Sequence, residues 1–129
     1  MPNITHASKH PLHRYLWMSV HDDLARKMVF IGGPRQVGKT TFALSFLTTP
    51  PKNETHPAYL NWDLVDHRER ILSGEMPSNE KIILLDEIHK YARWRGLVKG
   101  LYDTRKSKLS ILVTGSARLD YYRKGGDSL

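Results

Sequence analysis

Apolar residues recur along this chain at two spacings, and the alternation between them predicts an α/β fold. Between residues 10 and 27 the spacing is helical and predicts a leading helix with one buried face, formed by Leu12, Tyr15, Leu16, Val20 and Leu24. Residues 28–31 are a short apolar run that ends in a Gly-Gly-Pro turn, and residues 40–47 have a helical composition. The predicted order is therefore strand, glycine-rich loop, helix.

The middle of the chain begins with a connection and then repeats this alternation. Residues 48–57 contain three prolines among polar residues, which predicts an exposed connection. Residues 58–62 predict a second strand. Asp63 is the expected N-cap of the next helix, and Gly74 is the expected stop.

The last part of the chain contains the most apolar run. Residues 82–85 read Ile-Ile-Leu-Leu without alternation, a pattern typical of a central parallel strand that is covered on both faces. Residues 89–106 predict a helix, and residues 109–113 predict a fourth strand. The inner stripe of that helix is expected to consist of Trp94, Leu97, Val98 and Leu101. Alternating strands and helices favour a parallel sheet with right-handed crossovers.

Composition narrows the class of protein. The chain has 129 residues, of which 40% are hydrophobic and 26% charged, and this length and composition predict a single folded domain with one hydrophobic core. There is no cysteine, which excludes disulfides and thiolate metal sites, and no run of about 18 apolar residues, so we expect no membrane span and a cytoplasmic location. The net charge of +7 favours polyanionic partners, but the basic residues are dispersed, so DNA binding stays open.

One segment matches the phosphate-loop pattern G-x-x-x-x-G-K-[ST], and it consists of Gly33, Pro34, Arg35, Gln36, Val37, Gly38, Lys39 and Thr40. Its place between a strand and a helix separates a working loop from a chance match. Backbone N–H groups would face phosphate oxygens, Lys39 would supply charge, and the Thr40 hydroxyl would bind magnesium. Thr41 adjoins this cofactor-binding set, with a role that we interpret as structural. The segment predicts binding of ATP, or a closely related nucleotide, with Mg2+.

Carboxylates follow the most apolar strand. We predict that Asp86 binds the metal and that Glu87 polarises the attacking water, whereas the alternative for Glu87 is capping of the next helix. Ser116 or Thr114, at the end of the fourth strand, would sense the γ-phosphate, and we favour Ser116. The predicted catalytic residues are therefore Glu87, Lys39 and Ser116.

The segment Asp86-Glu87-Ile88-His89 also spells the DExH box of superfamily 2 helicases. Those helicases carry a different loop and a longer interval than the 46 positions between Thr40 and Asp86. A helicase is therefore disfavoured.

Five stretches together resemble the AAA_14 group of prokaryotic P-loop ATPases, often described as ATP-binding proteins with a C-terminal DUF4143 region: 31–41, 59–63, 84–90 with Trp94, 113–120 and 125–129. The resemblance covers most of residues 12–129. It implies a three-layer α/β/α P-loop NTPase core of the ASCE type, with strand order 5-1-4-3-2. Four strands are expected here, so the resemblance implies a core that is incomplete at its C-terminal side, with residues 1–27 as a leading helical segment and 28–129 as the core.

The leading functional hypothesis is Mg-dependent ATP binding and hydrolysis, with any arginine finger coming from a later segment or a neighbour. The alternative is a nucleotide-dependent switch or scaffold with little hydrolysis, which binds a protein partner, a second copy or DNA. Phosphotransfer to a small acceptor is disfavoured because no arginine-rich lid segment is visible.

Overall fold

A parallel four-stranded sheet organises the chain in the computed structural model, which describes residues 11–25, 28–32, 38–75, 79–105 and 109–116. The strands are β1 (Val29–Gly32), β2 (Tyr59–Asn61), β3 (Ile82–Asp86) and β4 (Ser110–Gly115). Their order is β1-β4-β3-β2, so β4 lies between the phosphate-loop strand and the strand that ends in Asp86. This matches the expected order 1-4-3-2, and no fifth strand occurs within the described ranges.

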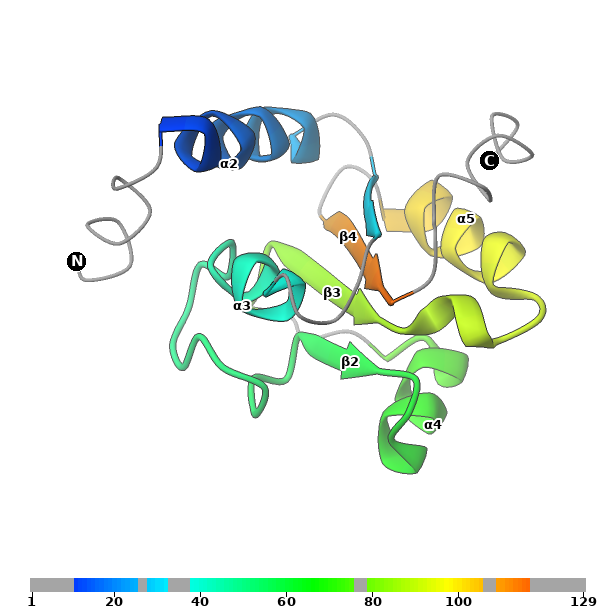
Figure 1. The fold of residues 1–129 in the computed structure, drawn as a ribbon. Coiled ribbons are helices and arrows are strands. Elements are labelled where there is room, and N and C mark those ends of the chain that lie inside the picture. The colour runs from blue at the N-terminus through cyan, green and yellow to red at the C-terminus, as the bar shows by residue number, and fades with distance from the viewer. Residues whose placement is uncertain (1–10, 26–27, 33–37, 76–78, 106–108, 117–129) are drawn as a thin grey trace.

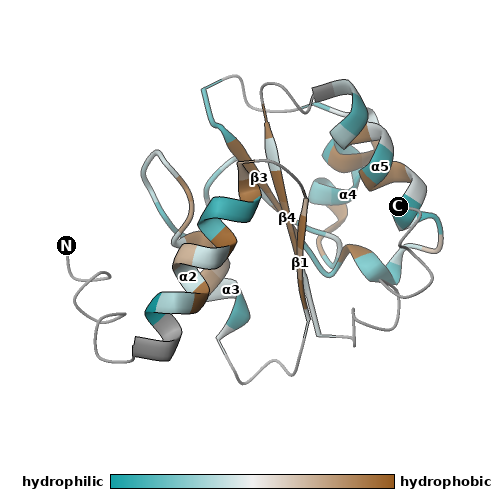
Figure 2. Ribbon diagram, turned by 90° about the horizontal axis from the view of Figure 1, so that it is seen from above, coloured by the Kyte–Doolittle hydropathy of each residue, from teal (hydrophilic) through white to brown (hydrophobic). Residues whose placement is uncertain are grey.

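Helices cover both faces of the sheet, as predicted for a three-layer fold. Figures 1 and 2 show α2 (Pro11–Leu24) and α3 (Lys39–Leu44) on one face, and α4 (Val65–Ser73) and α5 (Trp94–Arg105) on the other. Every residue of β3 is buried, which is what its unbroken apolar sequence predicts for a strand covered on both sides.

The inner face of α5 follows the predicted stripe. Trp94, Val98 and Leu101 are buried, and Leu97 is partly buried against the core. The ring of Trp94 meets Phe30 of β1 edge to face, with ring centroids 5.6 Å apart. The helical periodicity of this segment therefore identified the contact between α5 and the sheet.

The predicted buried face of α2 is wrong in its first half. Tyr15 and Leu16 are 74% and 52% exposed, whereas Val20 and Leu24 are buried, and the side chain of Leu12 lies outside the described part. Trp17 makes the contact instead. Its indole stacks on Phe46 at 4.8 Å, and its N–H donates to Ser45 Oγ at 2.8 Å. The helix contacts its neighbours along a face that is rotated from the apolar stripe.

Asp63 is not the N-cap of α4. Leu64 occupies that position without a side-chain capping bond, and the Asp63 carboxylate instead accepts from Lys90 Nζ at 2.8 Å. The cap was mispredicted because this ion pair joins residues 27 apart in sequence. Gly74 ends α4 with a φ of 77°, as predicted.

The helix expected from residue 89 begins only at Trp94. Glu87 adopts a left-handed backbone with a φ of 60°, and a 3-10 turn, η2 (Ile88–Lys90), follows it. This turn buries Ile88 completely. None of the helices in the described ranges has the length and apolar composition needed to cross a membrane.

Candidate functional site

The predicted site residues that the structure describes come from the carboxyl ends of β3 and β4 and from the start of α3. Gly33, Pro34, Arg35, Gln36 and Val37 lie outside the described residues. Gly38 is described and has a φ of 72°, a left-handed conformation that favours glycine. Lys39 then begins α3 and is only 7% exposed. Thr41 is on the exposed side of this helix, away from the cavity described below.

Three hydroxyl groups hold the carboxylate of Asp86. Thr40 Oγ1 donates to Oδ2 at 3.1 Å, Tyr59 Oη donates to the same oxygen at 2.6 Å, and Thr114 Oγ1 donates to Oδ1 at 2.9 Å. The strand register explains the Thr114 bond directly, because Asp86 on β3 lies beside Thr114 on β4. Tyr59 lies two residues before Asn61, the β2 neighbour of Asp86, and its side chain therefore shares a face of the sheet with the carboxylate. Asp86 is only 5% exposed, and these three bonds fix the orientation of its carboxylate.

Tyr59 is a site residue that the sequence analysis missed. Burial, together with the neighbouring Asp86 carboxylate, raises the pKa of Tyr59 well above its ordinary value, so the phenol keeps its proton and donates. A weak signal was present, since Tyr59 and Asn61 are polar at alternate positions of one strand and therefore share one side of it.

The Glu87 carboxylate is held by Ser116. The Ser116 N–H donates to Oε2 at 3.1 Å, and Ser116 Oγ donates to Oε1 at 2.9 Å. Two further nitrogens, His89 Nε2 and Lys90 Nζ, each lie 3.6 Å from Oε1. Glu87 is the N-cap residue of η2, as the capping alternative expects, but its side chain makes no capping hydrogen bond. The two candidate sensors thus have different partners, Glu87 for Ser116 and Asp86 for Thr114.

A polar cavity of about 250 Å³ brings Asp86 and Glu87 together with the start of α3, whereas Thr114 and Ser116 do not line it. It is lined by Lys39, Thr40, Glu54, Tyr59, Asn61, Asp63, Asp86 and Glu87. The sequence analysis did not assign Glu54, Asn61 or Asp63 to a site. Glu54 gave no signal, because only the path of the connection before β2 brings it to the cavity.

Thr40 and Asp86 fit a magnesium ion. Magnesium prefers oxygen ligands in an octahedron with bonds of about 2.1 Å, which places neighbouring ligands about 3 Å apart. The Thr40 and Asp86 oxygens are 3.1 Å apart. Both are hard oxygen donors, and the cavity leaves room for phosphate or water to complete the coordination.

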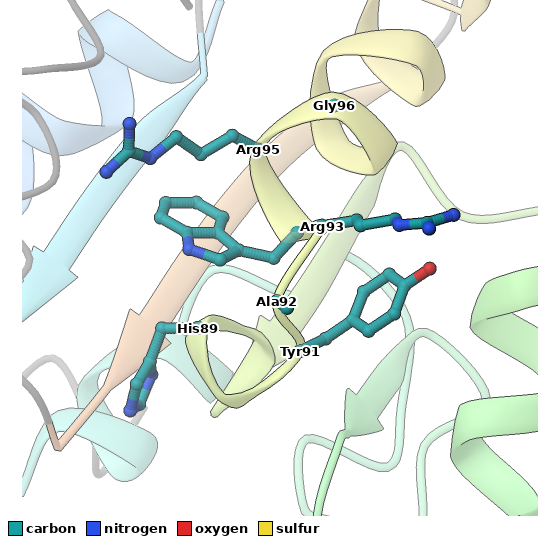
Figure 3. A pocket seen from close by; sticks show the side chains of 7 residues that line it. His89, Tyr91, Ala92, Arg93, Arg95 and Gly96 are labelled. Atoms are coloured by element: carbon teal, nitrogen blue, oxygen red, sulfur yellow. The ribbon is translucent and has the colours of Figure 1, made fainter.

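A larger hollow, of about 390 Å³, lies at the junction of η2 and α5, and no carboxylate side chain of the described residues lines it. Among the predicted site residues none lines it, and Arg93 and Arg95 point in opposite directions there (Figure 3). We therefore take the smaller cavity, where Lys39, Thr40, Asp86 and Glu87 converge, as the candidate site.

Comparison with known proteins gives one match. A model of the AAA_14 family, described as an AAA domain, matches residues 25–129. This range includes all four strands and every predicted site residue, whereas α2 precedes it. No curated protein and no solved structure matches the chain.

Proposed function

Because the chain belongs to the AAA_14 family of AAA domains, which are nucleotide-binding ATPase domains, we propose that it binds Mg-ATP at the carboxyl edge of its sheet and hydrolyses it. The observation that carries this proposal is the contact between Thr40 and Asp86. These residues are 46 positions apart, yet a hydroxyl at the start of α3 meets a buried carboxylate at the end of β3. Such a pair is what a magnesium nucleotide requires from a phosphate-loop protein.

Each residue has a chemical role in the proposal. Lys39, together with the backbone N–H groups of the loop 33–40, binds and neutralises the outer phosphates. Thr40 and Asp86 bind the metal ion, which when bound offsets the phosphate charge. Glu87 accepts a proton from the attacking water, and the hydroxyl of Ser116 donates to the γ-phosphate.

The first test compares the parent chain with two variants. Phosphate release from Mg-ATP and binding of a fluorescent ATP analogue are measured on the same samples. Glu87→Gln is expected to bind nucleotide like the parent and to lose about 100-fold or more in turnover, the usual contribution of a general base. Lys39→Ala is expected to lose binding. Normal turnover by Glu87→Gln would show that another group activates the water.

A second candidate function is a nucleotide-dependent switch with little intrinsic hydrolysis. It is favoured by the bonds between Ser116 and both oxygens of Glu87, since these donors compete with water for the carboxylate. For a switch, affinity for a protein partner or for DNA changes between ATP and ADP while phosphate release stays near background. Affinity for DNA would also fall steeply with added salt.

A further inference from the structure

Gly115, at the end of β4, makes room for the imidazole of His89. A Cβ atom at position 115 would lie 2.5 Å from His89 Nδ1 and 2.8 Å from Cε1, closer than real side-chain contacts. Only glycine therefore allows the ring to lie against this strand. The His89 side chain is 8% exposed, so the ring is confined between β4 and the η2 turn that carries it.

The two ring nitrogens of His89 have different surroundings. Nε2 faces Glu87 Oε1 at 3.6 Å, whereas Nδ1 is buried and has no hydrogen-bond partner among the described residues. A proton on Nδ1 would be a buried, unsatisfied donor, so the neutral ring carries its proton on Nε2, on the side of Glu87. Burial lowers the pKa of His89, although the charge of Glu87 opposes this effect, and the ring is neutral near neutral pH.

Glu87 needs a second donor if Ser116 acts on the nucleotide. The Ser116 hydroxyl has one proton, which now goes to Glu87 Oε1 and cannot also be donated to a phosphate. Lys90 is also 3.6 Å from Oε1, but its side chain is 39% exposed and its ammonium is bound to Asp63 at 2.8 Å. His89 is the buried, sterically confined neighbour of that oxygen.

We propose that His89 is a positioning residue for Glu87, whose Nε2–H holds Oε1 when the Ser116 hydroxyl turns to the terminal phosphate. This inference rests on the proposed function, because it assumes that Glu87 activates water. Gly115 has a role as well, since the absence of a side chain at this position leaves the space in which the His89 ring reaches the carboxylate.

Kinetics of three variants test the proposal. His89→Leu removes the donor, and Gly115→Ala displaces the ring, so each is expected to lower kcat about tenfold or more, with KM and analogue binding nearly unchanged. His89→Gln places an amide donor near the position of Nε2 and is expected to restore most of the activity. Thermal unfolding of each variant identifies any that fail to fold. The proposal is overturned if His89→Leu keeps the parent kcat, or if His89→Gln loses as much as His89→Leu.

An NMR measurement decides the same question without turnover. The His89 ring of the parent is expected to be the Nε2–H tautomer, with a proton resonance that shifts in Glu87→Gln and stays in place in Glu75→Gln, at an exposed glutamate that does not line the candidate cavity. An Nδ1–H tautomer, or a resonance insensitive to Glu87→Gln, overturns the proposal. If the parent binds nucleotide without releasing phosphate, hydrolysis is refuted, and the tautomer and its response still determine whether His89 contacts Glu87.

Discussion

Replacement of Glu80 by glutamine tests how the connection between α3 and β2 is held. The Glu80 side chain is completely buried just before β3. Its Oε1 accepts from the Thr48 N–H at 3.0 Å, Thr48 Oγ1 at 2.6 Å and the Lys81 N–H at 3.2 Å, and its Oε2 accepts from Thr49 Oγ1 at 2.7 Å. His56 Nε2 lies 3.5 Å from Oε2. This network explains why His56 is buried within a connection that was predicted to be exposed.

The cost of Glu80→Gln follows from these partners. The amide oxygen can take the place of Oε1, so three donors keep an acceptor, but the bonds lose the assistance of a negative charge. The amide nitrogen replaces Oε2, and the Thr49 hydroxyl must reverse its direction. Charged hydrogen bonds contribute about 1.5–3 kcal/mol and neutral ones about 1 kcal/mol, and the neutral amide costs less to bury. We expect a net loss of about 2 kcal/mol in the free energy of unfolding.

The loss should depend on pH in a defined direction. Burial by itself raises the pKa of Glu80, but the hydrogen bonds from Thr48, Thr49 and Lys81 outweigh burial and hold the pKa below its ordinary value of 4.5. A depressed carboxyl pKa stabilises the folded state above the unfolded pKa, and this contribution disappears as the pH falls through the folded pKa. The difference in unfolding free energy between the parent and Glu80→Gln should therefore be largest near neutral pH and should shrink below about pH 4.

Urea unfolding followed by tryptophan fluorescence, near neutral pH and again at about pH 3.5, measures both effects. Glu75→Gln, at an exposed glutamate, is the matched control and should unfold like the parent. The reasoning would be refuted if the parent and Glu80→Gln had equal urea midpoints near neutral pH. It would also be refuted if their difference in unfolding free energy were as large in acid as near neutral pH.

Three further predictions concern the site and its supports. Tyr59→Phe removes the 2.6 Å hydrogen bond to the Asp86 carboxylate and should lower the free energy of unfolding in urea by about 1.5 kcal/mol. An unchanged urea midpoint would contradict this expectation. Gly38→Ala should lower the free energy of unfolding by about 1 kcal/mol, because Gly38 has a left-handed backbone. Gly96 lies in a helix and, like Gly38, has open space around an added Cβ, so Gly96→Ala should raise the free energy of unfolding. Equal effects of the two substitutions would refute the backbone argument. Burial, then the charge of a nearby arginine, lowers the pKa of His67, so the parent should lose stability as the pH falls below about 6.5. His67→Asn should lose less stability than the parent as the pH falls. Equal losses in the two proteins would exclude His67 as a cause of the pH dependence.

Local patterns in the sequence were sufficient for most elements. The apolar run before Asp86 became a fully buried strand, because a strand covered on both faces needs apolar residues at every position. The α5 stripe and the glycine stop after α4 also lie where periodicity and backbone preference predict them. The exact phosphate-loop pattern, followed by Asp86-Glu87 at a strand end, was enough to predict that these residues share one sheet edge. The strand order came from the resemblance to a family rather than from local pattern.

Other features depend on contacts between residues that are distant in sequence, and local pattern does not encode them. Asp63 pairs with Lys90 instead of capping a helix, and Glu87 adopts a left-handed turn that delays α5. Tyr59 reaches Asp86 because β2 lies beside β3, and the His89 ring fits only because β4 ends in a glycine. The sequence alone determined which residues carry the candidate chemistry, since residue types and short spacings record it. The tertiary structure decided which groups hold them in place, because those partners meet only when separate strands and turns pack together.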